Sequence, residues 1–118
     1  MADGGLFIGW GAPIAGREAK GLEVFNEALQ YYGRLQQEGG IQGFEVGLLE
    51  PHGGDLGGFI LLRGSREQLT QLRLEEEFER MTTRAALVVE GVGVVSVLMG
   101  DDLQRGIGVY QQAVEELT

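Results

Sequence analysis

Four strand-like runs of apolar residues follow one another along the chain, each bounded by glycine or other turn residues. Residues 6–10, 41–49 and 58–63 alternate between two faces or are apolar on both, as strands of a sheet are. The run at residues 91–99 is β-branched and apolar on both faces, which predicts a buried central strand. No helix fits between the second and third runs, so these are expected to form an antiparallel hairpin.

Apolar residues at helical spacing occupy the segments between these runs. Residues 17–38 carry a stripe wide enough to cover a sheet, and a double glycine ends it. A Ser-x-x-Gln capping box at residue 65 begins a shorter helix. The spacing then continues to residue 88, which predicts a further helix that bends near Arg73 and has Leu74 on its inner face.

A last helix is expected from Asp101 and Asp102 onward, because acidic residues stabilise helix N-termini. Its apolar positions recur at spacings of four, three, four and three residues, which predicts a single stripe. These positions are Leu103, Ile107, Tyr110, Val114 and Leu117. The stripe is expected to be buried, either against the body of the same chain or against a second subunit.

The resulting order is β-α-β-β-α-β with an additional C-terminal helix, and residues 1–118 are expected to form a single domain. This is the order of the ferredoxin-like α+β fold, an antiparallel sheet with helices on one face. In its strands, hairpin and bent second helix the chain resembles the dimeric α+β barrel superfamily. The resemblance implies two sheets packed face to face in a homodimer. It implies no single activity, because the superfamily includes cofactor-free monooxygenases, isomerases, dehalogenases and haem-handling proteins.

The faces of the predicted sheet favour the same dimer. Crossovers of one hand place both main helices on one face. If the opposite face were exposed to water, its residues should be polar, yet the first, third and last strands carry apolar residues on both sides. A monomer would therefore expose an apolar patch beyond the usual few hundred Å². A homodimer through the sheet face covers this patch; the C-terminal helix is the competing cover within one chain.

Composition sets aside several classes of partner. The formal charge of −9 repels phosphate backbones and anionic surfaces, so nucleic acid and membrane are not expected as main partners. The absence of cysteine excludes disulfides and thiolate chemistry. The first residues lack a basic segment followed by an apolar targeting run, so a cytoplasmic location is expected.

Two glycine-rich stretches fail as phosphate-binding loops. Residues 11–17 have P-loop spacing, but Arg17 stands where lysine is required and Glu18 where Ser or Thr is required. Gly91 and Gly93 begin a strand, whereas a dinucleotide-binding motif follows one. No nucleotide or other cofactor is therefore expected.

Four residues are candidates for ligand contact. Trp10 ends the first strand beside a glycine turn, where pockets often open. His52, the single histidine, lies in a glycine-rich loop with two carboxylates nearby; an exposed loop position is favoured over a general base or a metal ligand. Glu45 on the second strand is a candidate acid or base, and Arg63 at the end of the third a candidate for an anionic ligand, although solvated charges are commoner on strands. No metal site is expected.

Three tyrosines on apolar helix stripes complete the set of candidates. Tyr31, Tyr32 and Tyr110 belong to the core by default, but each hydroxyl needs a partner, so one of them is a candidate to point into a cavity. The first functional hypothesis is a homodimer that binds a small apolar or aromatic molecule. The rival is a cofactor-independent monooxygenase or isomerase acting in the same cavity. A purely structural partner-binding module, without a cavity, is the third class.

Overall fold

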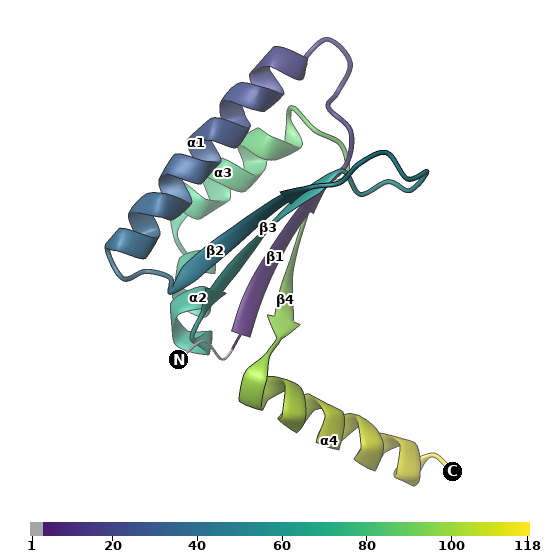
Figure 1. Ribbon diagram of the computed structural model, residues 1–118. Helices are drawn as coiled ribbons and strands as arrows, with labels where there is room; N and C mark the ends of the chain where they lie inside the picture. Colours follow the sequence, from purple (N-terminus) through teal and green to yellow (C-terminus); the bar gives the residue numbers. More distant parts are fainter. Residues whose placement is uncertain (1–3) are drawn as a thin grey trace.

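A four-stranded antiparallel sheet with helices on one face forms the body of the protein in the computed structural model, which describes residues 4–118 (Figure 1). The strands are β1 (Gly4–Trp10), β2 (Gly43–Leu48), β3 (Gly58–Gly64) and β4 (Gly93–Leu98). The helices are α1 (Glu18–Gln37), α2 (Arg66–Arg73), α3 (Glu76–Ala86) and α4 (Gly100–Glu116). The strand order is β2-β3-β1-β4, with every neighbouring pair antiparallel. The predicted ferredoxin-like α+β fold is confirmed.

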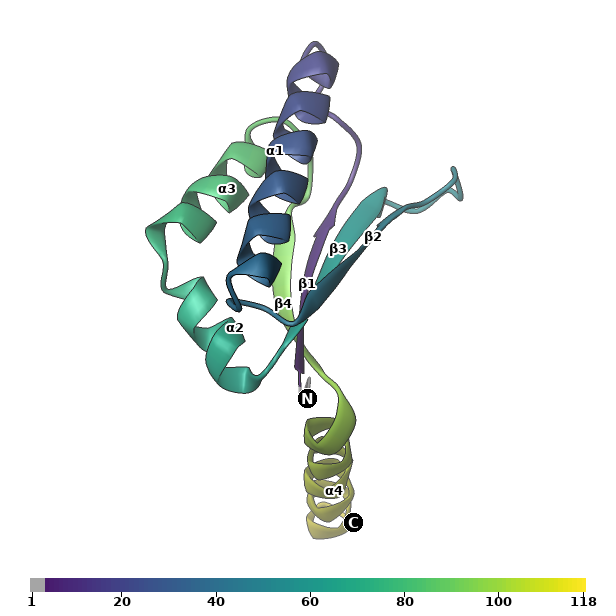
Figure 2. The ribbon, with the colours of Figure 1, turned by 60° about the vertical axis from the view of Figure 1, so that its left-hand side comes forward.

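The core lies between the sheet and the layer of α1, α2 and α3, which all cover the same face (Figure 2). Alternation along the central strands directs Leu6, Ile8, Ile60 and Leu62 to this face, and all four are buried. The register places Leu6 opposite Leu62 and Ile8 opposite Ile60, so these side chains pack as cross-strand pairs. The helices contribute Val24, Tyr31, Tyr32, Leu69, Leu72 and Phe78.

The helix expected to bend near Arg73 is divided in two at that residue, into α2 and α3. The capping box at the start of α2 forms as predicted: Ser65 Oγ accepts the Gln68 N–H at 3.1 Å, and Gln68 Oε1 accepts the Ser65 N–H at 2.8 Å. Leu74 lies in the break and is 76% exposed, so its expected inward position is wrong. The helical spacing ceases to apply where the helix ends.

The strand expected to be central is at the edge of the sheet. β4 pairs with β1 and forms one border of the four-stranded sheet. Val95 and Leu98 are 56% and 48% exposed in the single chain. The prediction of a buried central strand is wrong because an apolar pattern on both faces reports what lies above and below a strand, and not whether it has neighbours on both sides.

The face of the sheet opposite the helices is apolar, as predicted, and is here named the open face. Its side chains are Phe7, Glu45, Phe59, Leu61, Arg63, Val95 and Val97, with glycines between them. The large side chains lie flat over these glycines. A Cβ on Gly47, for example, would come within 2.5 Å of the Phe59 ring. In the single chain no helix of the described residues covers the open face (Figure 2).

Helix α4 projects away from the body beyond the end of β4 (Figure 1). None of its residues is buried; Leu103 and Tyr110 are 42% and 70% exposed. Gly100, with φ +57°, turns the chain between β4 and the helix. Burial of the α4 stripe against its own body, one of the two expected arrangements, is therefore wrong. The competing cover of the open face within one chain does not form either.

Candidate functional site

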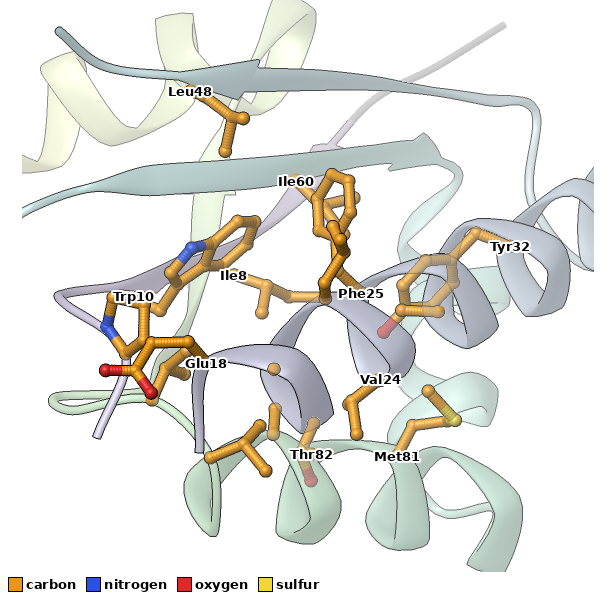
Figure 3. A pocket seen from close by; sticks show the side chains of 17 residues that line it. Ile8, Trp10, Glu18, Val24, Phe25, Tyr32, Leu48, Ile60, Met81 and Thr82 are labelled. Atoms are coloured by element: carbon orange, nitrogen blue, oxygen red, sulfur yellow. The ribbon is translucent and has the colours of Figure 1, made fainter. Parts of the chain in front are cut away.

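A cavity of about 300 Å³ lies between the sheet and helices α1 and α3 (Figure 3). It is lined by Ile8, Trp10, Pro13, Glu18, Gly21, Leu22, Val24, Phe25, Ala28, Tyr32, Leu48, Ile60, Met81, Thr82, Ala85, Val88 and Val89. This lining is mostly apolar. Small-molecule sites have volumes of about 300–1,000 Å³, apolar walls and a few polar groups. The cavity therefore has the size and composition of a site for a small molecule.

Short side chains on the two helices leave this space open. Gly21 and Ala28 of α1 and Thr82 and Ala85 of α3 are among the residues that line the cavity. Larger side chains at these positions would fill the gap between the helices and the sheet, as the core residues do elsewhere. The site thus exists because the apolar stripes of α1 and α3 are built from small residues at this end of the sheet.

Trp10 forms the wall of the cavity at the end of β1. Its partner across the sheet is Gly58. A Cβ on Gly58 would come within 2.7 Å of the indole, so the glycine gives the ring room to lie over β3. The indole meets the ring of Phe25 edge-on, with centroids 5.9 Å apart. The structure therefore places Trp10 at a cavity, as its position beside the glycine turn suggested; its contact with a ligand stays a prediction.

Besides the indole of Trp10, the polar side chains that line the cavity among the described residues are Glu18, Tyr32 and Thr82. Glu18 begins α1 and is exposed at the mouth. Tyr32 is only 2% exposed, and its hydroxyl is directed toward the cavity (Figure 3). Burial raises the pKa of Tyr32 above its ordinary value, and the neighbouring Tyr31 adds to the rise. The Tyr32 hydroxyl thus stays neutral and can donate a hydrogen bond to a ligand.

Two of the other candidate residues meet on the open face, away from the cavity. Glu45 Oε1 lies 3.4 Å from Arg63 Nε, so the two form an ion pair across β2 and β3. The Arg63 guanidinium occupies the space above Gly43, where a Cβ would come within 2.9 Å of Nη2. The structure therefore brings Glu45 and Arg63 together with each other but not with the cavity.

His52 occupies an exposed loop between β2 and β3, as the sequence favoured. Its Nδ1 accepts the Gly54 N–H at 3.2 Å, and its Nε2 lies 2.7 Å from the Leu56 carbonyl oxygen. Because a carbonyl only accepts, this geometry assigns the ring proton to Nε2. The loop itself occupies both ring nitrogens, and His52 does not line the cavity.

Several residues of the site were not singled out by the sequence. Glu18 attracted notice only because it breaks the P-loop pattern. Phe25 and Tyr32, two helical turns apart, belong to the α1 stripe that faces the sheet. That periodicity identifies the inner face of α1 but cannot separate the wall of a cavity from a filled core. The one signal for Tyr32 is its hydroxyl, which requires a partner, and the sequence shares this signal among Tyr31, Tyr32 and Tyr110.

Residues 4–118 show neither a candidate metal site nor a candidate membrane-spanning helix. In this part of the chain no three His, Asp or Glu side chains gather in an arrangement that could hold a metal ion. None of the helices described combines the length and the apolar character needed to cross a membrane.

Comparison with known proteins identifies a fold and no family. No family model matches the chain, and no curated protein matches it. Among solved structures, a dimeric protein of unknown function with a ferredoxin-like fold from Bacteroides fragilis has a TM-score of 0.60 at 15% identity, covering 82% of this chain and 97% of that one. A dimeric ferredoxin-like protein of unknown function from a Jannaschia species has a TM-score of 0.64 at 14% identity, covering 81% and 99%.

An enzyme is among the similar structures as well. SnoaB, a cofactor-independent oxygenase from Streptomyces nogalater, has a TM-score of 0.54 at 14% identity, covering 85% of this chain and 96% of that one. At these identities the likeness shows the fold alone. The chain has a ferredoxin-like fold shared with dimeric proteins of unknown function and with an oxygenase, in keeping with its resemblance to the dimeric α+β barrels.

Proposed function

We propose that the protein is a small homodimeric binding protein that takes a neutral apolar or aromatic molecule into the cavity beneath α1 and α3. The observation that carries the proposal is the cavity, with its apolar wall and the single buried hydroxyl of Tyr32. Mostly apolar pockets with a few polar groups are typical sites for small apolar ligands. The rings of Trp10 and Phe25 offer aromatic surface, and Tyr32 offers one hydrogen bond for orientation.

A cofactor-independent oxygenase or isomerase is the second candidate, because SnoaB is among the structural neighbours. Such chemistry needs a group that takes a proton from the bound substrate. The raised pKa keeps the Tyr32 hydroxyl neutral, and a neutral phenol is a poor base; the Glu18 carboxylate lies only at the mouth. His52, Glu45 and Arg63 lie outside the cavity. Binding without catalysis therefore has the better support.

The ligand proposal can be tested with Trp10, because it is the only tryptophan in the chain and lies in the cavity wall. The probe is N-phenyl-1-naphthylamine, a neutral aromatic dye that accepts excitation energy from tryptophan. Saturable energy transfer from Trp10 is expected for the wild-type protein. Ala85→Leu fills the cavity and should abolish the transfer, whereas Ala86→Leu, on the neighbouring exposed residue, should preserve it. Equal binding by both variants would place the dye elsewhere and refute the proposal.

The homodimer of the proposal forms through the open face. In the single chain Val95 is exposed on this face and Phe7, Phe59, Leu61 and Val97 are half-buried, and two of the similar structures are dimeric. Two copies related by a two-fold axis can cover each other's open face in a closed dimer. Light scattering should give twice the chain mass. Val95→Glu on the open face should give a monomer, and Gln30→Glu, at an exposed position of α1, should not.

Composition supports the remaining parts of the proposal. The formal charge of −9 opposes binding to nucleic acid and to anionic membranes. These exclusions, and the cytoplasmic location, stay predictions.

A further inference from the structure

We propose that α4 is an exchanged arm, so that in the homodimer the α4 of each copy packs its apolar stripe on the other copy. The stripe consists of Leu103, Ile107, Tyr110, Val114 and Leu117. This inference rests on the homodimer proposed above and adds a second contact to it. Every residue of the stripe is at least 42% exposed in the single chain.

Helix α4 lacks the means to be stable alone in water. It has 17 residues, only slightly more than the about 12–15 below which even Ala-rich helices are marginal, and it is not Ala-rich. Gly106 and Gly108 lie in its interior, where glycine is less favourable than any residue except proline. Met99, at the N-cap position, makes no side-chain capping hydrogen bond. Since no residue of α4 is buried against its own body, its stability has to come from another packing surface.

The first turns of α4 are held in a direction that leads away from the body. Asp102 Oδ1 accepts a hydrogen bond of 2.6 Å from Arg66 Nη2 of α2 and lies 3.6 Å from Arg105 Nη2. The Leu98 side chain fits the notch at Gly106, where a Cβ would come within 2.6 Å of it. The helix is thereby anchored at one end and extends beyond the sheet (Figure 2).

A second copy of the chain is the occupant that this surface fits. Each copy carries both an uncovered stripe and an uncovered open face, so two-fold pairing can satisfy both at once. A copy with formal charge −9 repels its partner, but the stripe contains no charged residue and the Glu45–Arg63 pair on the open face is neutral as a unit. Two such copies can therefore meet on these surfaces without bringing like charges together.

The exchanged arms supply much of the area that a stable dimer needs. A helix of this length is about 25 Å long and 10 Å wide, so it covers roughly 250 Å² of its partner. Two exchanged arms then bury roughly 1,000 Å² when both surfaces of each contact are counted. The open faces would need to supply roughly the remaining 600 Å² of the total of about 1,600 Å² that is standard for specific interfaces.

Isotope-filtered NMR on dimers refolded from a mixture of ¹³C-labelled and unlabelled chains reports contacts between copies only. Intermolecular NOEs from the methyl groups of Ile107 and Val114 are expected. Ile107→Glu should raise the dissociation constant of the dimer at least about tenfold, because it places a charge in a buried contact. Gln112→Glu is the matched control; it lies about 140° around the helix from Ile107 and should leave the constant unchanged.

The outcomes separate this inference from the homodimer on which it rests. If filtered NOEs arise only from the open face and Ile107→Glu keeps the wild-type dissociation constant, the exchanged arm is overturned while the dimer stands. NOEs from Ile107 confined to its own chain overturn it in the same way. A monomeric wild-type protein overturns both. Ile107 is 44% exposed in the single chain, so the variant is expected to fold, and circular dichroism of the monomer checks this.

Discussion

The rings of Phe7 and Phe59 stack on the open face, with centroids 5.5 Å apart and planes inclined by 14°. They belong to the adjacent strands β1 and β3 but are not directly opposite, since Phe7 pairs with Leu61 and Phe59 with Gly9. The stack therefore spans a diagonal of the central strand pair. It offers flat aromatic surface on the face proposed to meet a second copy.

Truncation of this stack should weaken the dimer. Phe59→Ala is expected to cost roughly 2 kcal/mol or more of association free energy, as aromatic anchors at interface centres do. Sedimentation equilibrium measures the change. The matched control is Leu74→Ala, which removes an apolar side chain that is 76% exposed and lies outside the open face. Equal dissociation constants for the two variants would show that the open face is not the interface.

The hydroxyl of Tyr32 should distinguish between probes of similar shape. Because it is neutral and directed into the cavity, it can donate to a carbonyl oxygen but gains nothing from a hydrocarbon. The wild-type protein should bind 2-acetylnaphthalene more tightly than 2-ethylnaphthalene by about 0.5–1.5 kcal/mol, the net worth of one hydrogen bond. Tyr32→Phe should remove this difference, which calorimetry can measure. A difference that survives in the variant would assign the hydrogen bond to another group.

The protein should lose stability at alkaline pH because of the buried position of Tyr31. Its hydroxyl is buried without a hydrogen-bond partner among residues 4–118. Burial, and then the carboxylates of Glu75 and Glu77, raise its pKa from 10.0 to about 12, against the opposing effect of Arg34. Because the pKa of Tyr31 is higher in the folded than in the unfolded state, the neutral hydroxyl contributes to the free energy of unfolding. This contribution is fully present below pH 10.0 and is lost as the pH rises toward about 12.

The variant Tyr31→Phe isolates this effect. It should be as stable as the wild type at neutral pH or more so, because it removes an unpaired buried hydroxyl. It should also lose less stability than the wild type at alkaline pH. Urea unfolding across this range measures both. A loss of more than about 1 kcal/mol at pH 7 would mean that the hydroxyl has a partner in the folded state.

The loop that contains His52 should contribute little to either stability or binding. The ring makes only local hydrogen bonds, to Gly54 and Leu56, in an exposed segment. His52→Ala should change the free energy of unfolding by less than about 0.5 kcal/mol. It should leave energy transfer from Trp10 to the naphthylamine dye unchanged. A large effect on dye binding would show that His52 takes part in ligand binding.

The fold was accessible from the sequence because local signals agreed with one another. Alternation identified β1 and β3, a glycine-rich break defined the hairpin, and the Ser65–Gln68 box located the start of α2. The errors have a common cause. The patterns at Leu74, at β4 and on α4 reveal which side of an element is apolar but not what lies beside it.

The site was harder to predict for a related reason. Gly21, Ala28 and Ala85 occupy inward positions on their helices, where a small residue and a large one are equally consistent with helical periodicity. Only their meeting across two helices separated by nearly half the chain creates a cavity. Trp10 could be named because a bulky side chain at the end of a strand is conspicuous. Glu45 and Arg63 were named for their charge, and the strand register shows that they serve each other.

The glycines of the open face have a consequence for the geometry of any layer built on it. Gly5, Gly9 and Gly47 lie beneath the side chains of Met99, Phe7 and Phe59, respectively. A Cβ on any of these glycines would push the overlying side chain away from the sheet. Two ordinary sheets pack with a separation of about 10 Å. With their large side chains laid flat, two copies of this sheet could approach more closely. The smallest residues of the face, and not its aromatic rings, would then determine the thickness of the layer between the subunits.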